Sequence, residues 1–168
     1  VTTNQRLNMN ISGGGNVACP AGARFRQQTD TTAAPSQWSY FDALGRPVLQ
    51  VTQSFNVGVS GKDASAVCTG YDAAGRPKQV SNPFFLPGTV GGSPAPASDV
   101  CTAAGLAWTT TSYDALGRPL QVTAPNDSGG TISVSTAYQG LTTTTTNPRG
   151  YATAQTRNAL GEVVLVVD

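Results

Sequence analysis

The sequence predicts an all-β protein: repeated β-hairpins in a continuous, twisted antiparallel sheet, with little or no helix. The first reason is a short motif that occurs three times: an aromatic residue, Asp, two small or apolar residues, Gly, Arg and Pro. The second is a composition rich in Thr, Ser, Val, Gly and Pro, residues that favour strands and turns. The third is the weak helical periodicity of the apolar residues along the chain.

Each copy of the motif predicts a strand, a tight turn and a returning strand. Asp opens the turn because its carboxylate accepts backbone N–H groups further along the chain. Gly supplies the positive φ that follows a type I turn in a short hairpin loop. Pro starts the returning strand, where a strand tolerates it. The turn residues are Asp42, Gly45 and Arg46; Asp72, Gly75 and Arg76; Asp114, Gly117 and Arg118; and, in a degenerate fourth copy, Asn158 and Gly161.

The Arg of each copy is expected across the neck of its own hairpin. There its guanidinium can stack on the motif aromatic or pair with the motif Asp, an exposed contact that contributes about 0–1 kcal/mol. In the first copy we interpret Phe41 as inserted before Asp42 and matched by an extra residue at Val48-Leu49. Matched insertions would lengthen the hairpin and keep its register. In the fourth copy, Arg157 and Glu162 are expected to form a cross-strand pair.

Four segments are expected along the chain. Residues 1–37 form an N-terminal strand and turn segment, with a degenerate repeat as one interpretation. Residues 38–83 contain repeats 1 and 2, and residues 84–105 form a Pro-, Gly- and Ala-rich inserted loop. Residues 106–168 contain repeat 3 and the degenerate repeat 4. A run of Thr at 142–146 suits a strand whose two faces are both partly polar.

The charge pattern excludes some classes of partner. Charged residues make up 11% of the chain, the net charge is +1, and the Arg residues are spread along the chain. Binding to nucleic acid through its phosphates is therefore not expected. No apolar run is long enough to cross a membrane. The chain starts without Met or a signal peptide, so we expect a processed product or a piece of a longer protein.

The three cysteines, Cys19, Cys68 and Cys101, have no CxxC spacing, and the chain has no His. A zinc site is therefore not expected, and no cofactor is predicted. An odd number of cysteines permits one disulfide and one free thiol. If the chain is extracellular, we prefer a Cys68–Cys101 bridge, because it would tether the 84–105 loop. The alternative is three buried thiols.

Enzymatic activity is not expected either. Without His, catalysis would need Asp, Cys, Ser or Lys, but Asp42, Asp72 and Asp114 are equivalent positions of a repeat. A turn-capping role explains all three at once. Glu162 has no partner carboxylate nearby in the sequence, and Cys68 has no adjacent base.

The repeated unit in Tyr71–Arg76, Tyr113–Arg118 and Phe41–Arg46, together with Asn147-Pro148-Arg149-Gly150 and the Thr-rich strands, resembles the YD-repeat or rearrangement-hotspot (RHS) family. The resemblance covers roughly residues 38–168. It implies an extracellular, secreted or cell-surface protein whose hairpins wind into a spiralling sheet. In toxin relatives the sheet closes into a shell around a cytotoxic C-terminal segment, and related shells occur in animal adhesion proteins.

The chain also departs from the family pattern. Pro follows the motif where an apolar residue is usual, the spacing between copies is irregular, and no acidic self-cleavage motif is present. Because the repeats are too few to close a cavity, the resemblance implies a solenoid-like segment of such a shell, or a short relative that assembles with others.

We therefore expect a non-catalytic structural segment of an exported RHS or YD-repeat protein. Its expected partners are further repeats of the same or a longer chain, or an encapsulated polypeptide. One alternative is a cell-surface adhesion or carbohydrate-binding module that uses the tyrosines at positions 40, 71, 113 and 138. Another is a self-assembling extracellular filament subunit, joined through open edge strands.

Overall fold

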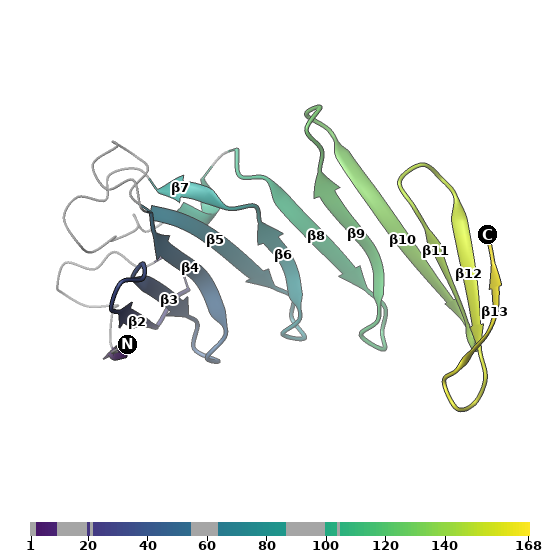
Figure 1. Cartoon of the computed structure of the whole chain (residues 1–168), viewed down its shortest axis with the longest axis horizontal. Coiled ribbons are helices and arrows are strands. Elements are labelled where there is room, and N and C mark those ends of the chain that lie inside the picture. Colours follow the sequence, from purple (N-terminus) through teal and green to yellow (C-terminus); the bar gives the residue numbers. More distant parts are fainter. Residues whose placement is uncertain (1–2, 10–19, 21, 55–63, 87–99, 104) are drawn as a thin grey trace. The chain divides into compact units, whose positions relative to one another are not determined.

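The computed structural model describes residues 3–9, 20, 22–54, 64–86, 100–103 and 105–168, and these residues are almost entirely β (Figure 1). They form thirteen strands and one turn of 3₁₀-helix, η1 (Val100–Thr102), with no α-helix in the described part of the chain. The predicted all-β class is confirmed. The strands are β1 (Thr3–Met9), β2 (Phe25–Thr31), β3 (Gln37–Phe41), β4 (Pro47–Gln53), β5 (Ala64–Tyr71), β6 (Pro77–Ser81), β7 (Phe84–Leu86), β8 (Trp108–Tyr113), β9 (Pro119–Pro125), β10 (Thr131–Gln139), β11 (Thr142–Thr146), β12 (Ala152–Arg157) and β13 (Val163–Val167).

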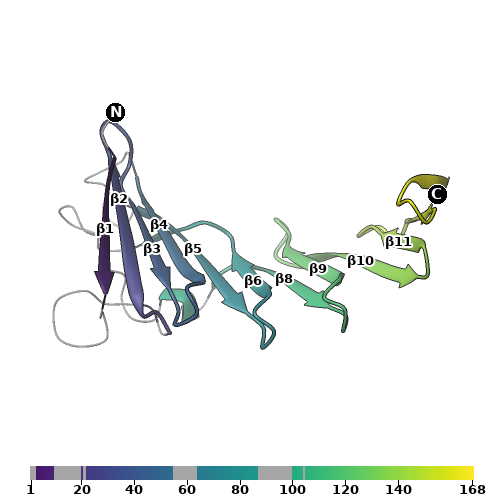
Figure 2. The same cartoon turned by 90° about the horizontal axis from the view of Figure 1, so that it is seen from below.

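The strand order follows the sequence almost throughout: β1-β2-β3-β4-β5-β6-β8-β9-β10-β11-β12-β13. Figure 2 shows β1 to β5 side by side in this order. Short turns account for the order, because they return the chain beside the strand it has just left. The exception is β7, which pairs with the start of β5 at Ala64–Ala66. The segment predicted as an inserted loop, 84–105, therefore begins with a strand, while its residues 87–99 and 104 lie outside the described part.

The chain divides into two compact units. Unit 1 comprises Val1–Tyr71 and Val80–Leu106, and unit 2 comprises Asp72–Gln79 and Ala107–Asp168. The N-terminal segment 1–37 contributes β1 and β2 to unit 1, and these two strands pair antiparallel.

Unit 1 contains the hydrophobic core. Register places Trp38 beside Val51 and Tyr40 beside Leu49, and all four side chains are buried. Alternation along the strands puts them on one face of the sheet. Cys68, also buried, extends the same face on β5 because it lies opposite Leu49. The other buried apolar residues described in unit 1 are Ala23, Ala64, Ala66 and Leu86.

Unit 2 has no fully buried side chain among its described residues. Thr110 and Thr123 pair across strands at the same distance from their turn as Trp38 and Val51 do in unit 1. Small polar residues replace the core here, and hydroxyls pair across strands, as between Thr142 and Thr156 at 2.9 Å. Both faces of this part of the sheet meet solvent.

The first hairpin is not longer than the others, so the interpretation of Phe41 as an insertion is wrong. Phe41 lies opposite Pro47 in the same way that Tyr113 lies opposite Pro119. In both hairpins the register shifts directly before this aromatic residue, as at a β-bulge. Phe41 is therefore the motif aromatic itself. The sequence comparison misplaced it because Tyr40, the preceding core residue, is also aromatic.

No helix in the described residues has the length and apolar character needed to span a membrane.

Candidate functional site at the hairpin ends

Each full copy of the motif forms the same closed turn. In the second copy, the Asp72 N–H donates to the Arg76 carbonyl at 2.9 Å, and the Gly75 N–H donates to the Asp72 carbonyl at 2.9 Å. The Asp72 Oδ1 accepts the N–H groups of Ala74 and Arg76, both at 2.9 Å. Gly75 has φ of 83°. That is the left-handed region, where a side chain would be strained. The turn thus satisfies its own backbone with one carboxylate oxygen.

Three further turns have the same geometry with Asn in place of Asp. Each has Gly with positive φ three residues after Asn, and each Asn Oδ1 accepts one or two backbone N–H groups inside its turn. These turns span 126–130, 147–151 and 158–162. The sequence motif identified only the last as a repeat copy. The shared signal of Asp or Asn followed three residues later by Gly would have found the other two.

The fourth copy differs from the expected Arg157–Glu162 pair. Glu162 accepts a hydrogen bond from the Asn158 Nδ2 at 2.7 Å, while Arg157 donates to the Gly161 carbonyl at 2.8 Å. Asn supplies a donor that Asp lacks, so Glu162 finds its partner within the turn.

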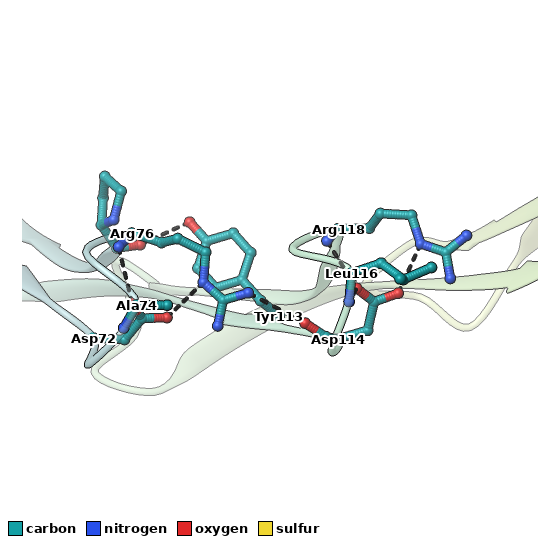
Figure 3. Close-up of polar contacts among 8 residues, drawn as sticks. Asp72, Ala74, Arg76, Tyr113, Asp114, Leu116 and Arg118 are labelled. Carbon is teal, nitrogen blue, oxygen red and sulfur yellow. Dashed lines mark hydrogen bonds and ion pairs between the residues drawn. The ribbon is translucent and has the colours of Figure 1, made fainter.

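In the three Asp turns the second carboxylate oxygen holds the Arg. The Nε of Arg46, Arg76 and Arg118 donates to the Asp Oδ2 four residues before it, at 2.7 Å in each case. Each Arg is thereby fixed in one orientation, as Figure 3 shows for two of the hairpins.

These contacts keep the carboxylates ionised. In Asp42 and Asp114 burial raises the pKa, but hydrogen bonds from the backbone N–H and guanidinium of the following Arg outweigh burial and lower the pKa from 3.8. In Asp72 the backbone N–H of Arg76 is the largest cause, and the pKa is likewise lowered from 3.8.

The oriented Arg stacks on a tyrosine of the next hairpin, not on the aromatic of its own. Arg46 lies over Tyr71 at 4.4 Å, Arg76 over Tyr113 at 4.5 Å and Arg118 over Tyr138 at 4.2 Å from the ring centroid. Each of these contacts lies within a single unit. Of the two contacts expected for the Arg, the pairing with the Asp of its own turn is confirmed, and the stacking on the aromatic of its own hairpin is wrong.

The same tyrosines also bind the preceding hairpin through their hydroxyls. Tyr71 donates to the carbonyl of Pro47 at 2.8 Å, Tyr113 to that of Pro77 at 2.7 Å, and Tyr138 to that of Pro119 at 3.0 Å. We call this series of Asp–Arg–Tyr contacts, with the Pro carbonyls, the hairpin-end ladder. It joins the hairpins that begin with β3, β5 and β8 each to the hairpin after it.

Arg76 makes one more contact than the pattern requires. Its Nη1 donates to the carbonyl of Asp114, the first residue of the next turn, at 3.2 Å (Figure 3). One guanidinium thus contacts a carboxylate, a ring and a backbone carbonyl.

Tyr138 is a ladder residue that the motif did not reveal. It precedes a short turn, Gln139 to Thr142, which has no Asp, yet its ring and hydroxyl make the same contacts as Tyr113. The available signal is a tyrosine near the end of a strand, directly before a Gly-containing turn.

Comparison with known proteins bears on the fold alone. No protein family model and no curated protein sequence matches the chain. The crystal structure of TcdB2-TccC3 without its hypervariable C-terminal region superposes with a TM-score of 0.62 over 87% of this chain, at 16% identity. This chain shares its β fold with a part of TcdB2-TccC3. It spans only 8% of the length of that chain.

A disulfide joins Cys68 of β5 to Cys101 of η1, with the Cα atoms 5.7 Å apart. The Cys68 N–H donates to the Ser81 Oγ at 2.9 Å, so the buried end of the bridge is also held to β6. The bridge attaches η1 to the core strands of unit 1. Cys19 lies outside the described residues.

The tyrosines suggested as binding residues are occupied within the fold. Tyr40 is 0% exposed. One face of each of the other three rings packs against an Arg. In Tyr71 burial raises the pKa of the hydroxyl, Arg46 opposes this effect, and Asp42 adds to it.

Proposed function

We propose that this chain is a non-catalytic structural segment of an exported RHS or YD-repeat protein, in which its hairpins form part of the wall of a shell or scaffold. The observation that carries the proposal is the hairpin-end ladder. It uses the repeat's Asp and Arg, with tyrosines, to fasten one hairpin to the next. Because the motif residues are engaged in these contacts, the motif specifies how neighbouring hairpins are joined.

The likeness to TcdB2-TccC3 supports the same proposal. That structure is of a protein with a hypervariable C-terminal region. A shell that encloses a C-terminal effector is what the RHS resemblance implies for toxin relatives, and this chain would supply one stretch of such a wall.

The chemistry of the turns supports a non-catalytic role. The carboxylates of Asp42, Asp72 and Asp114 are each paired with an Arg and bonded to backbone N–H groups. The described residues contain no group of three His, Cys, Asp or Glu side chains able to hold a metal ion.

We also propose an extracellular or cell-surface location for the protein. The disulfide supports this location, because such bonds persist in oxidising compartments.

The proposed partners are further repeats of the same or a longer chain, or a polypeptide enclosed by the wall. In the strand order β13 is an edge strand, and its five apolar side chains, Val163–Val167, are 45–60% exposed. An exposed apolar edge pairs readily with another strand. The same edge favours one second candidate, a filament in which separate copies pair edge to edge. Nucleic acid and membrane are not proposed as partners.

Electron cryo-microscopy of the intact secreted protein that contains this sequence tests the proposal. We expect β13 to pair with a following hairpin of the same polypeptide, within a wall that surrounds a further segment. Pairing of β13 with a separate copy would replace the shell by a filament. If β13 is unpaired and exposed to solvent, the shell and the filament are both contradicted, and an adhesion module is favoured.

A further inference from the structure

A groove of about 250 Å³ lies on one face of β11 and β12 in unit 2. It is lined by Thr143, Thr145, Asn147, Tyr151, Thr153 and Gln155. Register accounts for the common face, because Thr143 lies opposite Gln155 and Thr145 opposite Thr153. The turn at 147–151 closes one end of this four-residue block.

The lining of the groove is polar and uncharged. Hydroxyl and amide groups line the groove together with one aromatic residue, Tyr151, which is 71% exposed. The Oδ1 of Asn147 is used inside its turn by the N–H groups of Arg149 and Tyr151, which leaves its amide N–H donors available. Without a cation in the lining, the groove offers little to a phosphate or carboxylate.

One hydroxyl pair on β11 and β12 is used within the sheet, and it lies on the face opposite the groove. There Thr142 and Thr156 bond to each other, while the hydroxyls of Thr144 and Thr146 make no hydrogen bond to another described side chain. On the groove face, the hydroxyls of Thr143, Thr145 and Thr153 make no hydrogen bond to another described side chain. Strand geometry spaces these groups about 4.8 Å apart across the strands and about 6.7 Å along them. The groove therefore presents regularly spaced hydroxyl donors and acceptors beside the ring of Tyr151.

We propose that this groove binds a neutral saccharide. One sugar ring would lie with its C–H face on Tyr151, while its hydroxyls exchange hydrogen bonds with the threonines, Asn147 and Gln155. The volume of 250 Å³ suits a single sugar unit of a longer chain, since pockets for drug-sized ligands are about 300–1,000 Å³. No ladder tyrosine is among the lining residues, although Tyr138 lies opposite Thr143 on the adjoining strand. The proposal does not depend on the chain being part of a shell.

The test is titration of the ¹⁵N-labelled chain with maltohexaose, cellohexaose and the hexamer of N-acetylglucosamine, followed by amide chemical shifts. At least one of these neutral probes is expected to shift residues 143–155 selectively, with a dissociation constant on the order of 1 mM. A sulfated heparin hexasaccharide serves as the charged comparison and is expected to bind more weakly.

Matched variants separate the groove from the rest of the sheet. Tyr151→Ala is expected to weaken binding about tenfold, the scale of one aromatic contact. The turn should survive this change, because Gly130 occupies the equivalent position in the 126–130 turn. Thr145→Val is expected to weaken binding about threefold through a lost hydrogen bond, whereas Thr144→Val, on the opposite face, leaves it unchanged.

Three results would overturn the proposal: no selective shift with any neutral hexamer, equal effects of Thr144→Val and Thr145→Val, or preferential binding of the sulfated probe. None of them bears on the shell proposal, which is tested through the pairing of β13.

Discussion

At the scale of single residues, one oxygen atom closes each turn of this type: the Oδ1 of its first residue. Asp and Asn both supply it, and the protein uses both. The two differ in the second side-chain atom. Asp occurs where Arg follows four residues later and needs an acceptor, as in Asp72–Arg76. Asn occurs where Gly130, Tyr151 or Glu162 follows. The choice between Asp and Asn therefore reports whether a hairpin contributes an Arg to the ladder.

The Asp turns should make the chain sensitive to acid. The folded-state pKa of Asp42, Asp72 and Asp114 is lowered from 3.8, so these groups stabilise the fold fully above the unfolded pKa of about 3.9. Their contribution is lost as the pH falls through the lowered folded values. The midpoint of urea unfolding should therefore fall as the pH is lowered below about 4, where the carboxyl groups of the unfolded chain begin to bind protons.

The control for acid sensitivity is a variant with Asn at all three Asp positions. It should keep its turns, as the natural Asn turns do, and show a flatter acid dependence. If the wild type and this variant lose stability in parallel, the turn carboxylates are not the acid-sensitive groups.

The turn residues were predictable from sequence because every bond in the turn joins residues at most four positions apart. The stacking partner of each Arg was not. Arg76 and Tyr113 are far apart in the sequence, and their contact depends on which strand lies beside which. Tyr138 was missed as a stacking partner because no motif marks its turn.

At the scale of elements, the hairpin is the unit that repeats and the ladder is the joint between units. Arg76 combines the ion pair with Asp72, the stack on Tyr113 and the bond to the Asp114 carbonyl. Neither residue of the Arg–Tyr pair is fully buried, so each contact is individually modest.

A double-mutant cycle on Arg76 and Tyr113 measures this joint. Arg76→Met and Tyr113→Leu should each destabilise the chain, and their coupling energy should be about 0.5–1 kcal/mol, the range for an exposed cation–π contact. Free energies of unfolding from urea titration give the coupling. Arg149→Met, at an exposed turn position without a ladder contact, should be additive with Tyr113→Leu. Additivity of the Arg76 and Tyr113 changes would contradict the ladder.

Strand order was predictable because short turns favour neighbours in sequence, and the all-β class followed from composition. The length of the first hairpin was misjudged because two aromatics, Tyr40 and Phe41, stand before Asp42. One belongs to the core and the other precedes the turn, where Phe41 stacks on Phe25 with ring centroids 4.8 Å apart. Only the register distinguishes them.

At the scale of the whole molecule, the two units are stabilised by different means. Unit 1 has a buried face with Trp38, Tyr40 and Leu49, and a disulfide. Unit 2 depends on ladder contacts and backbone pairing. The repeat motif is the same in both, so the distribution of the core was not visible in it. The position of the core depends on the residues four positions before and nine positions after each Asp. In unit 1 these are Trp38 and Val51, and in the third copy they are Thr110 and Thr123.

Loss of the disulfide should weaken unit 1 selectively. The bridge spans a sequence separation of 33 residues, for which loop-closure entropy gives about 3–4 kcal/mol. Reduction should accelerate hydrogen exchange in β3 to β5 and leave β9 to β12 unchanged. In a Cys101→Ala variant these strands should already exchange faster, and reductant should add nothing. Equal acceleration in β9 to β12 would show that the bridge stabilises the chain globally.

The strands of unit 2 make their main contacts with the strands on either side of them in the order. A sheet joined in this way should unfold one strand at a time under force. A force applied to Asp168 perpendicular to the strands would detach β13 first and then β12, and each detachment would leave the pairing of the next strand intact. The unfolding force would rise at the hairpins that the Arg118–Tyr138 and Arg76–Tyr113 contacts join to their neighbours.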